Sequence, residues 1–193
     1  KSLSPPLRKA KDMFVFGCTV ALRVSDLKNL KRQNLERTTE STYLKVYSQK
    51  THIYTKVKLP AYALEILNRN KSRSNLLFRS SAIANFNNNI KRIAEKAGWT
   101  YEYPKYRCKM GKPYVVYKDK DKRMHYRFCD LVSTHTMRRT AITTMLNFGV
   151  EEQTVRKISG HAPGSVEFYK YVKYNQNAID KQTDLMFEKL VEN

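Results

Sequence analysis

Apolar residues recur with helical spacing in several stretches of the chain, which predicts that most of it is α-helical. A first helix starts at Ser4-Pro5-Pro6, because proline is tolerated in a first turn, and its dense apolar run predicts burial on nearly all sides up to Leu22. Further helices are expected over 60–70, 81–99, 134–148, 151–158, 165–174 and 177–193. After Thr134, the predicted inward stripe is Met137, Ala141, Met145 and Phe148.

Two stretches alternate with the period of a β-strand instead. Residues 42–49 and 52–60 are separated by Lys50-Thr51, which predicts an antiparallel hairpin with a lysine at its tip. In the second strand Thr55 and Val57 share one face, and Lys56 and Lys58 share the other. The expected class is therefore α+β, mainly α-helical with a small antiparallel sheet, in a single domain over 1–193.

The balance of charge limits the function more than the hydrophobic pattern does. Lys and Arg number 37 against 17 Asp and Glu, a net charge of +20, and such a surplus favours a polyanion such as nucleic acid. Three cysteines without a C-x-x-C pair indicate neither a disulfide framework nor a zinc site. The longest apolar run is too short for a membrane span.

Residues 100–132 combine this positive charge with tyrosines, which predicts a DNA-facing insertion built as a basic hairpin or loop. The tyrosines could stack on bases, or they could cover a strand pair. The predicted DNA-binding cations of the insertion are Lys112, Lys118, Lys120, Lys122 and Arg123.

Reactive side chains gather between Ser133 and Tyr171. His135, Arg138 and Arg139 lie within one helical turn, and residues three or four apart share a helix face. His161 follows Gly160, and Tyr171 comes ten residues later. Imidazoles, guanidinium groups and a phenol suit a phosphate held beside a nucleophile, because planar guanidinium groups match phosphate oxygens in pairs.

Four motifs occur in a fixed order: A-L-R-x-S-D-L at 21–27, Q-K-T at 49–51, H-x-x-R at 135–138, and G-H…Y at 160–171. In this order they resemble the catalytic domain of the tyrosine recombinases, the lambda-integrase family, and most of all the integrases of conjugative transposons. The resemblance implies that family's catalytic-domain fold. It also implies that a domain which clamps the other side of the DNA would precede Lys1 and is absent here.

The resemblance further implies a role for each matching residue. Arg23 and Arg138 would clamp the scissile phosphate, Lys50 would protonate the leaving 5′ oxygen, and Tyr171 would be the nucleophile. His135 and His161 would contact the phosphate and assist proton transfer, and Asp26 would support the site. Arg139 would be a phosphate or structural partner. The alternatives left open are Tyr169 as nucleophile and Lys56 or Lys58 as general acid.

The implied activity is metal-free cleavage and rejoining of DNA through a covalent 3′-phosphotyrosine, without any cofactor. A type IB topoisomerase, or a non-catalytic DNA-binding protein, is the alternative function. The expected partner is double-stranded DNA at specific attachment sites, with a homotetramer on DNA, weak association without it, and accessory DNA-bending or directionality factors. The tail at 175–193 would pack on a neighbouring protomer. The expected location is the cytoplasm, at the nucleoid.

Overall fold

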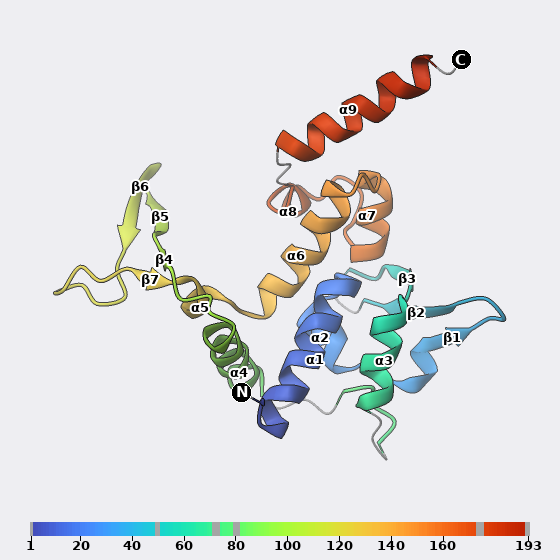
Figure 1. Cartoon of the computed structure of the whole chain (residues 1–193), viewed down its shortest axis with the longest axis horizontal. Coiled ribbons are helices and arrows are strands. Elements are labelled where there is room, and N and C mark those ends of the chain that lie inside the picture. Colours follow the sequence, from blue (N-terminus) through green and yellow to red (C-terminus); the bar gives the residue numbers. More distant parts are fainter. Residues whose placement is uncertain (1, 49–50, 71–73, 79–81, 173–175, 192–193) are drawn as a thin grey trace. The chain divides into compact units, whose positions relative to one another are not determined.

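The computed structural model describes residues 2–48, 51–70, 74–78, 82–172 and 176–191. The chain forms two compact units, one from 1–12 and 81–134 and the other from 13–80 and 135–193. Helix α1 (Pro5–Val20), blue in Figure 1, has its first residues in the first unit and the rest in the second. Within the described residues, no helix is both long and apolar enough to cross a membrane.

The first unit combines a helix with short strand pairs. Strand β5 pairs with β6, and β4 pairs with β7, each time antiparallel. Besides the start of α1, its elements are α4 (Ile83–Lys96), β4 (Glu102–Tyr103), β5 (Lys105–Lys109), β6 (Lys112–Val116), β7 (Tyr126–Arg127) and α5 (Phe128–Leu131).

The second unit surrounds a three-stranded antiparallel sheet, ordered β1-β2-β3, with helices. Its elements are α2 (Val24–Lys28), a 3₁₀ turn η1 (Arg32–Asn34), β1 (Leu35–Arg37), β2 (Thr42–Tyr47), β3 (Tyr54–Lys58), α3 (Ala61–Arg69), α6 (Thr134–Asn147), α7 (Glu152–Ser159), α8 (Val166–Tyr169) and α9 (Gln176–Val191), with the end of α1. The predicted α+β class, mainly helical with a small antiparallel sheet, is confirmed.

The alternation in the hairpin is confirmed residue by residue. Thr55 and Val57 are buried, while Lys56 and Lys58 are exposed on the opposite face of β3. Strand β2 pairs with β3 in a register that places Val46 opposite Thr55. The hairpin therefore turns one face toward the interior, as its period-2 pattern predicts.

Several expectations about the helices were wrong in detail. Phe148 is 85% exposed, and Ile142 and Leu146 are buried in its place, because α6 ends at Asn147 and Gly149 turns the chain with φ +81°. The helix expected over 165–174 is confined to Val166–Tyr169 in the described residues. A short helix, α2, begins directly after Arg23, and β1 adds a strand that had not been expected.

The core of the second unit supports the chemistry-bearing segments directly. A buried cluster joins α6, α7 and α8, and half-buried Tyr171 packs against it. Gly17 of α1 lies so close to α6 that a Cβ there would come within 2.6 Å of the Met137 sulfur and 3.2 Å of the Met137 Cβ, so a larger residue would force Met137 to shift. The residues of the buried cluster are Ala21, Ala141, Ile142, Leu146, Val155 and Phe168.

In the first unit, β5 and β6 form a two-stranded ribbon (Figure 1). Its register gives the two faces different side chains. Residues directly opposite in an antiparallel pair share a face, and successive residues alternate. One face therefore carries Lys105, Arg107, Lys109, Lys112, Tyr114 and Val116, and the other carries Tyr106, Cys108, Pro113 and Val115. All the cations of the ribbon strands lie on a single face.

Candidate active site

Arg138 forms the buried centre of the site. It projects from α6 and is only 4% exposed. Its Nη1 donates to the carbonyl of Ala21 at 2.8 Å, and its Nη2 lies 3.0 Å from Nε2 of His161. Burial, followed by repulsion from Arg23, lowers the pKa of Arg138 to about 10, while attraction to Tyr171 and Asp26 opposes the decrease. A guanidinium with this pKa remains charged at neutral pH.

Ala21, whose carbonyl accepts a hydrogen bond from this guanidinium, has an unusual backbone conformation. Helix α1 ends at Val20, and Ala21 has φ +56°, a left-handed conformation that costs a non-glycine residue about 1–2 kcal/mol. The Ala21 carbonyl then accepts the hydrogen bond from Arg138, and the chain enters α2 three residues later, at Val24. This local strain, stored beside Arg23, is typical of functional sites.

Arg23 lies at the N-cap of α2 and reaches two other segments. Its Nη1 lies 3.3 Å from the Ser48 hydroxyl oxygen and 3.4 Å from the Gly160 carbonyl oxygen. Thr51 donates to the same carbonyl at 3.1 Å. Arg23, and Ser48 and Thr51 at the turn end of the β2–β3 hairpin, therefore converge on the turn at Gly160.

Gly160 has to be glycine for this convergence. It ends α7 with φ +64°, in the left-handed region, where a side chain is strained. A Cβ at this position would also come within 3.3 Å of the Thr55 methyl group of β3. The turn can approach the hairpin closely because no side chain stands between them.

His161 follows this glycine and is 7% exposed. Its Nδ1 lies 2.7 Å from the Ser159 hydroxyl oxygen, and its ring packs edge-on against Phe168. Burial, together with the charges of Arg138, Arg23 and Arg156, lowers the pKa of His161 to about 3. The imidazole is therefore neutral at physiological pH.

This neutral histidine predicts a dependence of stability on pH. The folded-state pKa lies below the value of about 6.5 in the unfolded chain. Below pH 6.5 only the unfolded chain takes up this proton, so His161 should lower the free energy of unfolding by about 1.4 kcal/mol for each pH unit. Urea unfolding at pH 7.0 and 5.5 should show a steeper loss for wild type than for His161→Gln. Equal losses in the two proteins would contradict the shift.

Tyr171 faces the same cluster from the segment after α8. Its ring centroid lies 5.6 Å from that of His161, and its carbonyl accepts a hydrogen bond from Thr143 of α6 at 3.1 Å. Tyr169 differs, because it is 56% exposed and lies against Phe168 and the Arg156 guanidinium. The structure thus brings Tyr171, rather than Tyr169, beside His161 and Arg138.

The remaining predicted site residues have different surroundings. His135 and Arg139 are exposed on α6, with His135 one turn before Arg138. Asp26 lies half-buried in the first turn of α2 and attracts the Arg138 charge. Lys50 lies outside the described residues, although Ser48 and Thr51 on either side of it contact Arg23 and Gly160.

The two alternative lysines point away from this site. Lys56 pairs with Glu36 at 3.1 Å and lies over the Tyr43 ring, on the exposed face of β3. Lys58 shares this exposed face. The face of β3 that approaches Gly160 carries Thr55 instead. Neither strand lysine therefore lies on the face of β3 that approaches Gly160.

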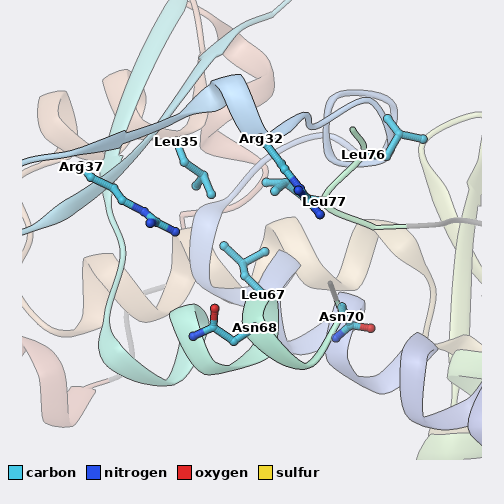
Figure 2. Close-up of a pocket in the computed structure, with 8 residues that line it drawn as sticks. All are labelled: Arg32, Leu35, Arg37, Leu67, Asn68, Asn70, Leu76 and Leu77. Atoms are coloured by element: carbon cyan, nitrogen blue, oxygen red, sulfur yellow. The ribbon is translucent and has the colours of Figure 1, made fainter. Parts of the chain in front are cut away.

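A pocket in the second unit lies apart from these residues. Its volume is about 420 Å³. Figure 2 shows Leu67 and Asn68 of α3 on one side of it and Leu35 and Arg37 of β1 on the other. Its lining residues are Arg32, Leu35, Arg37, Leu67, Asn68, Asn70, Leu76 and Leu77. None of these was predicted as a site residue.

Comparisons with known proteins agree with the family resemblance of the site residues. The model of the phage integrase family matches residues 8–177. The chain belongs to the phage integrase family. No curated protein sequence matches it. Among solved structures, the XerH site-specific recombinase bound to its difH substrate aligns with TM-score 0.60 and 14% identity, over 96% of this chain and 49% of that one.

Two other solved structures have a fold similar to that of this chain. The XerA recombinase aligns with TM-score 0.58 and 18% identity, over 96% of this chain and 65% of its own. The Tn1549 transposon integrase, in complex with circular intermediate DNA, aligns with TM-score 0.55 and 14% identity, over 93% and 59%. The chain therefore spans about half the length of XerH and somewhat more of the other two.

Sequence reasoning missed the supporting residues of the site. Ser48 and Ser159 are buried hydroxyl groups that bond Arg23 and His161. Arg156 lies with its guanidinium 4.2 Å from the Phe168 ring centre, next to the tyrosine segment. Only Ser159 left a signal in the sequence, because a polar residue breaks the buried face of its helix directly before the G-H motif.

Proposed function

We propose that this chain is the catalytic part of a site-specific DNA recombinase, which cleaves and rejoins DNA through a 3′-phosphotyrosine. The observation that carries the proposal is the buried Arg138 guanidinium, which contacts neutral His161 while Arg23 and Tyr171 lie around it. This set occurs in a chain of the phage integrase family. The substrate proposed is double-stranded DNA at specific attachment sites.

The proposed step is an in-line displacement at phosphorus. The Tyr171 phenol loses its proton to water as its oxygen attacks, the bond from phosphorus to the 5′ oxygen breaks, and Lys50 supplies a proton to that oxygen. Arg23 and Arg138 stabilise the charge that builds on the non-bridging oxygens, which is commonly the largest contribution to catalysis. The covalent intermediate keeps the energy of the broken bond, so the strand can be resealed without ATP.

Two residues complete the proposed site. Asp26, beside Arg138, would help hold the guanidinium charge in place, in keeping with its electrostatic attraction to that residue. His135 is exposed on α6, one turn before Arg138, and would meet the phosphate from the open side when DNA binds. The chemistry is proposed to proceed without a metal or other cofactor.

A nicked suicide substrate tests the proposal. A nick close to the scissile bond lets the 5′ fragment diffuse away, so the covalent complex accumulates and migrates slowly on a denaturing gel. A band that resists heat and detergent but disappears with protease is expected. Absence of any band on a verified site, with the chain fused to the N-terminal portion of a full-length relative, would instead favour a non-catalytic DNA-binding protein. Relaxation of supercoiled DNA without joining two sites would favour a topoisomerase.

The cationic face of the β5–β6 ribbon is proposed to bind DNA phosphates. Lys109 lies directly opposite Lys112, and like charges in that position destabilise a strand pair, so a bound anion would relieve them. The turn after the ribbon is less basic, because Lys120, Lys122 and Arg123 alternate with Asp119 and Asp121. Arg139, exposed on α6, is a further proposed phosphate contact.

Lys118 is held within the first unit. It pairs with Asp130 at 2.9 Å, and Arg127 donates to the same carboxylate. Burial would raise the pKa of Asp130, but hydrogen bonds from Arg127 and Lys118 outweigh it and lower the pKa to about 2. Lys118 is therefore proposed to contribute less to DNA binding than the ribbon cations.

This division of charge predicts a difference between two double variants. Arg107→Ser with Lys109→Ser should reduce the slope of log affinity against log salt by about 2 and weaken binding about 30-fold at 0.15 M salt, if each cation contacts one phosphate. Lys120→Ser with Lys122→Ser removes equal charge from the turn and should change binding only a few-fold. Fluorescence anisotropy with a DNA duplex across a salt series measures both. Equal losses would show that net charge alone matters.

Assembly on DNA is proposed to involve α9. Its Leu185, Met186 and Phe187 are 49–55% exposed, an apolar surface that a second copy could cover. We further propose a homotetramer on DNA with weak association in its absence, accessory bending or directionality factors, and a location with the chromosome in the cytoplasm.

A further inference from the structure

Ser159 touches the reactive histidine without being one of the predicted site residues. It is the last residue of α7 and is 1% exposed. Its Oγ donates to the Val155 carbonyl at 2.6 Å, lies 3.3 Å from the Arg156 carbonyl oxygen, and lies 2.7 Å from Nδ1 of His161. A buried hydroxyl with these three neighbours has a fixed orientation.

The single hydroxyl proton decides what His161 must contribute. A carbonyl oxygen only accepts, so the short contact with Val155 requires the Ser159 proton. The contact with His161 then requires a proton on Nδ1, which is donated to the serine oxygen. In a neutral imidazole with Nδ1–H, the lone pair belongs to Nε2.

Arg138 leads independently to the same arrangement. A guanidinium only donates, and its Nη2 lies 3.0 Å from Nε2, closer than the 3.3 Å to Nδ1. The nearer nitrogen must therefore accept, which requires the lone pair on Nε2. A doubly protonated ring would place two donors against each other at Arg138.

We propose that Ser159 is a positioning residue that holds His161 with its proton on Nδ1 and its lone pair on Nε2. This inference rests on the proposed function for its catalytic consequence. Because Nε2 accepts from Arg138, this tautomer holds the guanidinium in the orientation in which it would meet the scissile phosphate. Ser159 therefore acts on Arg138 through His161, and His161 itself neither takes up nor releases a proton.

The tautomer can be measured in the free protein. With ¹⁵N-labelled histidine, the two ring nitrogens differ in chemical shift according to which one carries the proton. We expect the Nδ1–H form for His161 in wild type and in Ser159→Thr, and a smaller share of it in Ser159→Ala, where only the Arg138 contact still favours it. A wild-type spectrum with the proton on Nε2 would overturn the proposal, and this result does not depend on whether the chain cleaves DNA.

Cleavage separates positioning from simple packing. Ser159→Ala should slow formation of the covalent complex about tenfold, the effect of one lost hydrogen bond, with DNA affinity unchanged. Ser159→Thr should restore the rate. In the His161→Ala background, Ser159→Ala should have no further effect, because the histidine it orients is gone.

The possible results test the positioning role of Ser159 separately from the proposed function. A tenfold loss that persists in the His161→Ala background would show that Ser159 acts through packing of α7, and would overturn the positioning role. Absence of cleavage in wild type, together with the Nδ1–H spectrum, would overturn the proposed function while leaving the tautomer assignment in place. Full cleavage by Ser159→Ala with an unchanged spectrum would overturn the positioning role as well.

Discussion

Replacing Tyr171 by phenylalanine is expected to abolish the covalent protein–DNA complex on the nicked substrate. The change removes a single oxygen atom, while the ring can keep its contacts with His161 and with the core cluster. Folding and DNA affinity should therefore stay close to wild type. Without the phenol oxygen there is no nucleophile, so no band should appear above background on the denaturing gel. Anisotropy with the same DNA provides the measurement of affinity.

Tyr169→Phe is the matched control, because it removes the same atom two residues earlier. Tyr169 is exposed and packs on Arg156 rather than on His161, so this variant should retain the covalent band at nearly the wild-type rate. Loss of the band in Tyr169→Phe alone would mean that the nucleophile had been assigned to the wrong tyrosine. Loss in both variants would indicate that the two hydroxyl groups cooperate.

Arg138→Lys is expected to lower the cleavage rate by about 10²- to 10³-fold, the cost of removing one preorganised donor to an oxyanion. Lysine keeps the charge but cannot spread donors across a plane. Arg138 already donates to the Ala21 carbonyl, lies against His161 and interacts with Tyr171. An ammonium cannot reach all three positions at once. Single-turnover cleavage measures the loss.

Arg139→Lys serves as its control on the same helix. Arg139 is exposed, so the substitution preserves a charge at the surface and should change cleavage by less than about threefold. Thermal unfolding of both variants is needed, since Arg138→Lys also weakens the link to Ala21. Equal cleavage by Arg138→Lys and wild type, in a folded protein, would remove Arg138 from the proposed phosphate clamp.

The fold could be predicted from the sequence wherever burial follows a regular period. Strand β3 alternates without exception, so the buried positions Thr55 and Val57 were predicted correctly. Phe148 was not, because the helical stripe was extended past the last turn of α6, where Gly149 turns the chain out. A periodic pattern predicts a face but does not show where an element stops.

The residues of the candidate site could be predicted from the sequence, but the contacts between them could not. The order of the motifs predicted four residues that lie together in the structure, namely Arg23, Arg138, His161 and Tyr171. Their catalytic roles remain predictions. The Arg138 bond to Ala21 spans 117 residues, and the Thr51 bond to Gly160 spans 109. Such contacts depend on tertiary packing, which the local sequence does not predict. The left-handed Ala21 is equally hidden, because alanine rarely adopts that conformation.

The two-faced ribbon has a practical consequence for observing DNA binding. Cys108 is exposed on its uncharged face, whereas Cys129 is buried and burial raises the pKa of Cys18 to about 12. A thiol-directed fluorophore should therefore attach selectively at Cys108, because thiolates are the reactive form. The dye would lie on the face opposite the cations. Its fluorescence should therefore change when DNA binds, while the dye leaves the cationic face free. The native chain thus carries its own attachment point for an optical reporter of the ribbon.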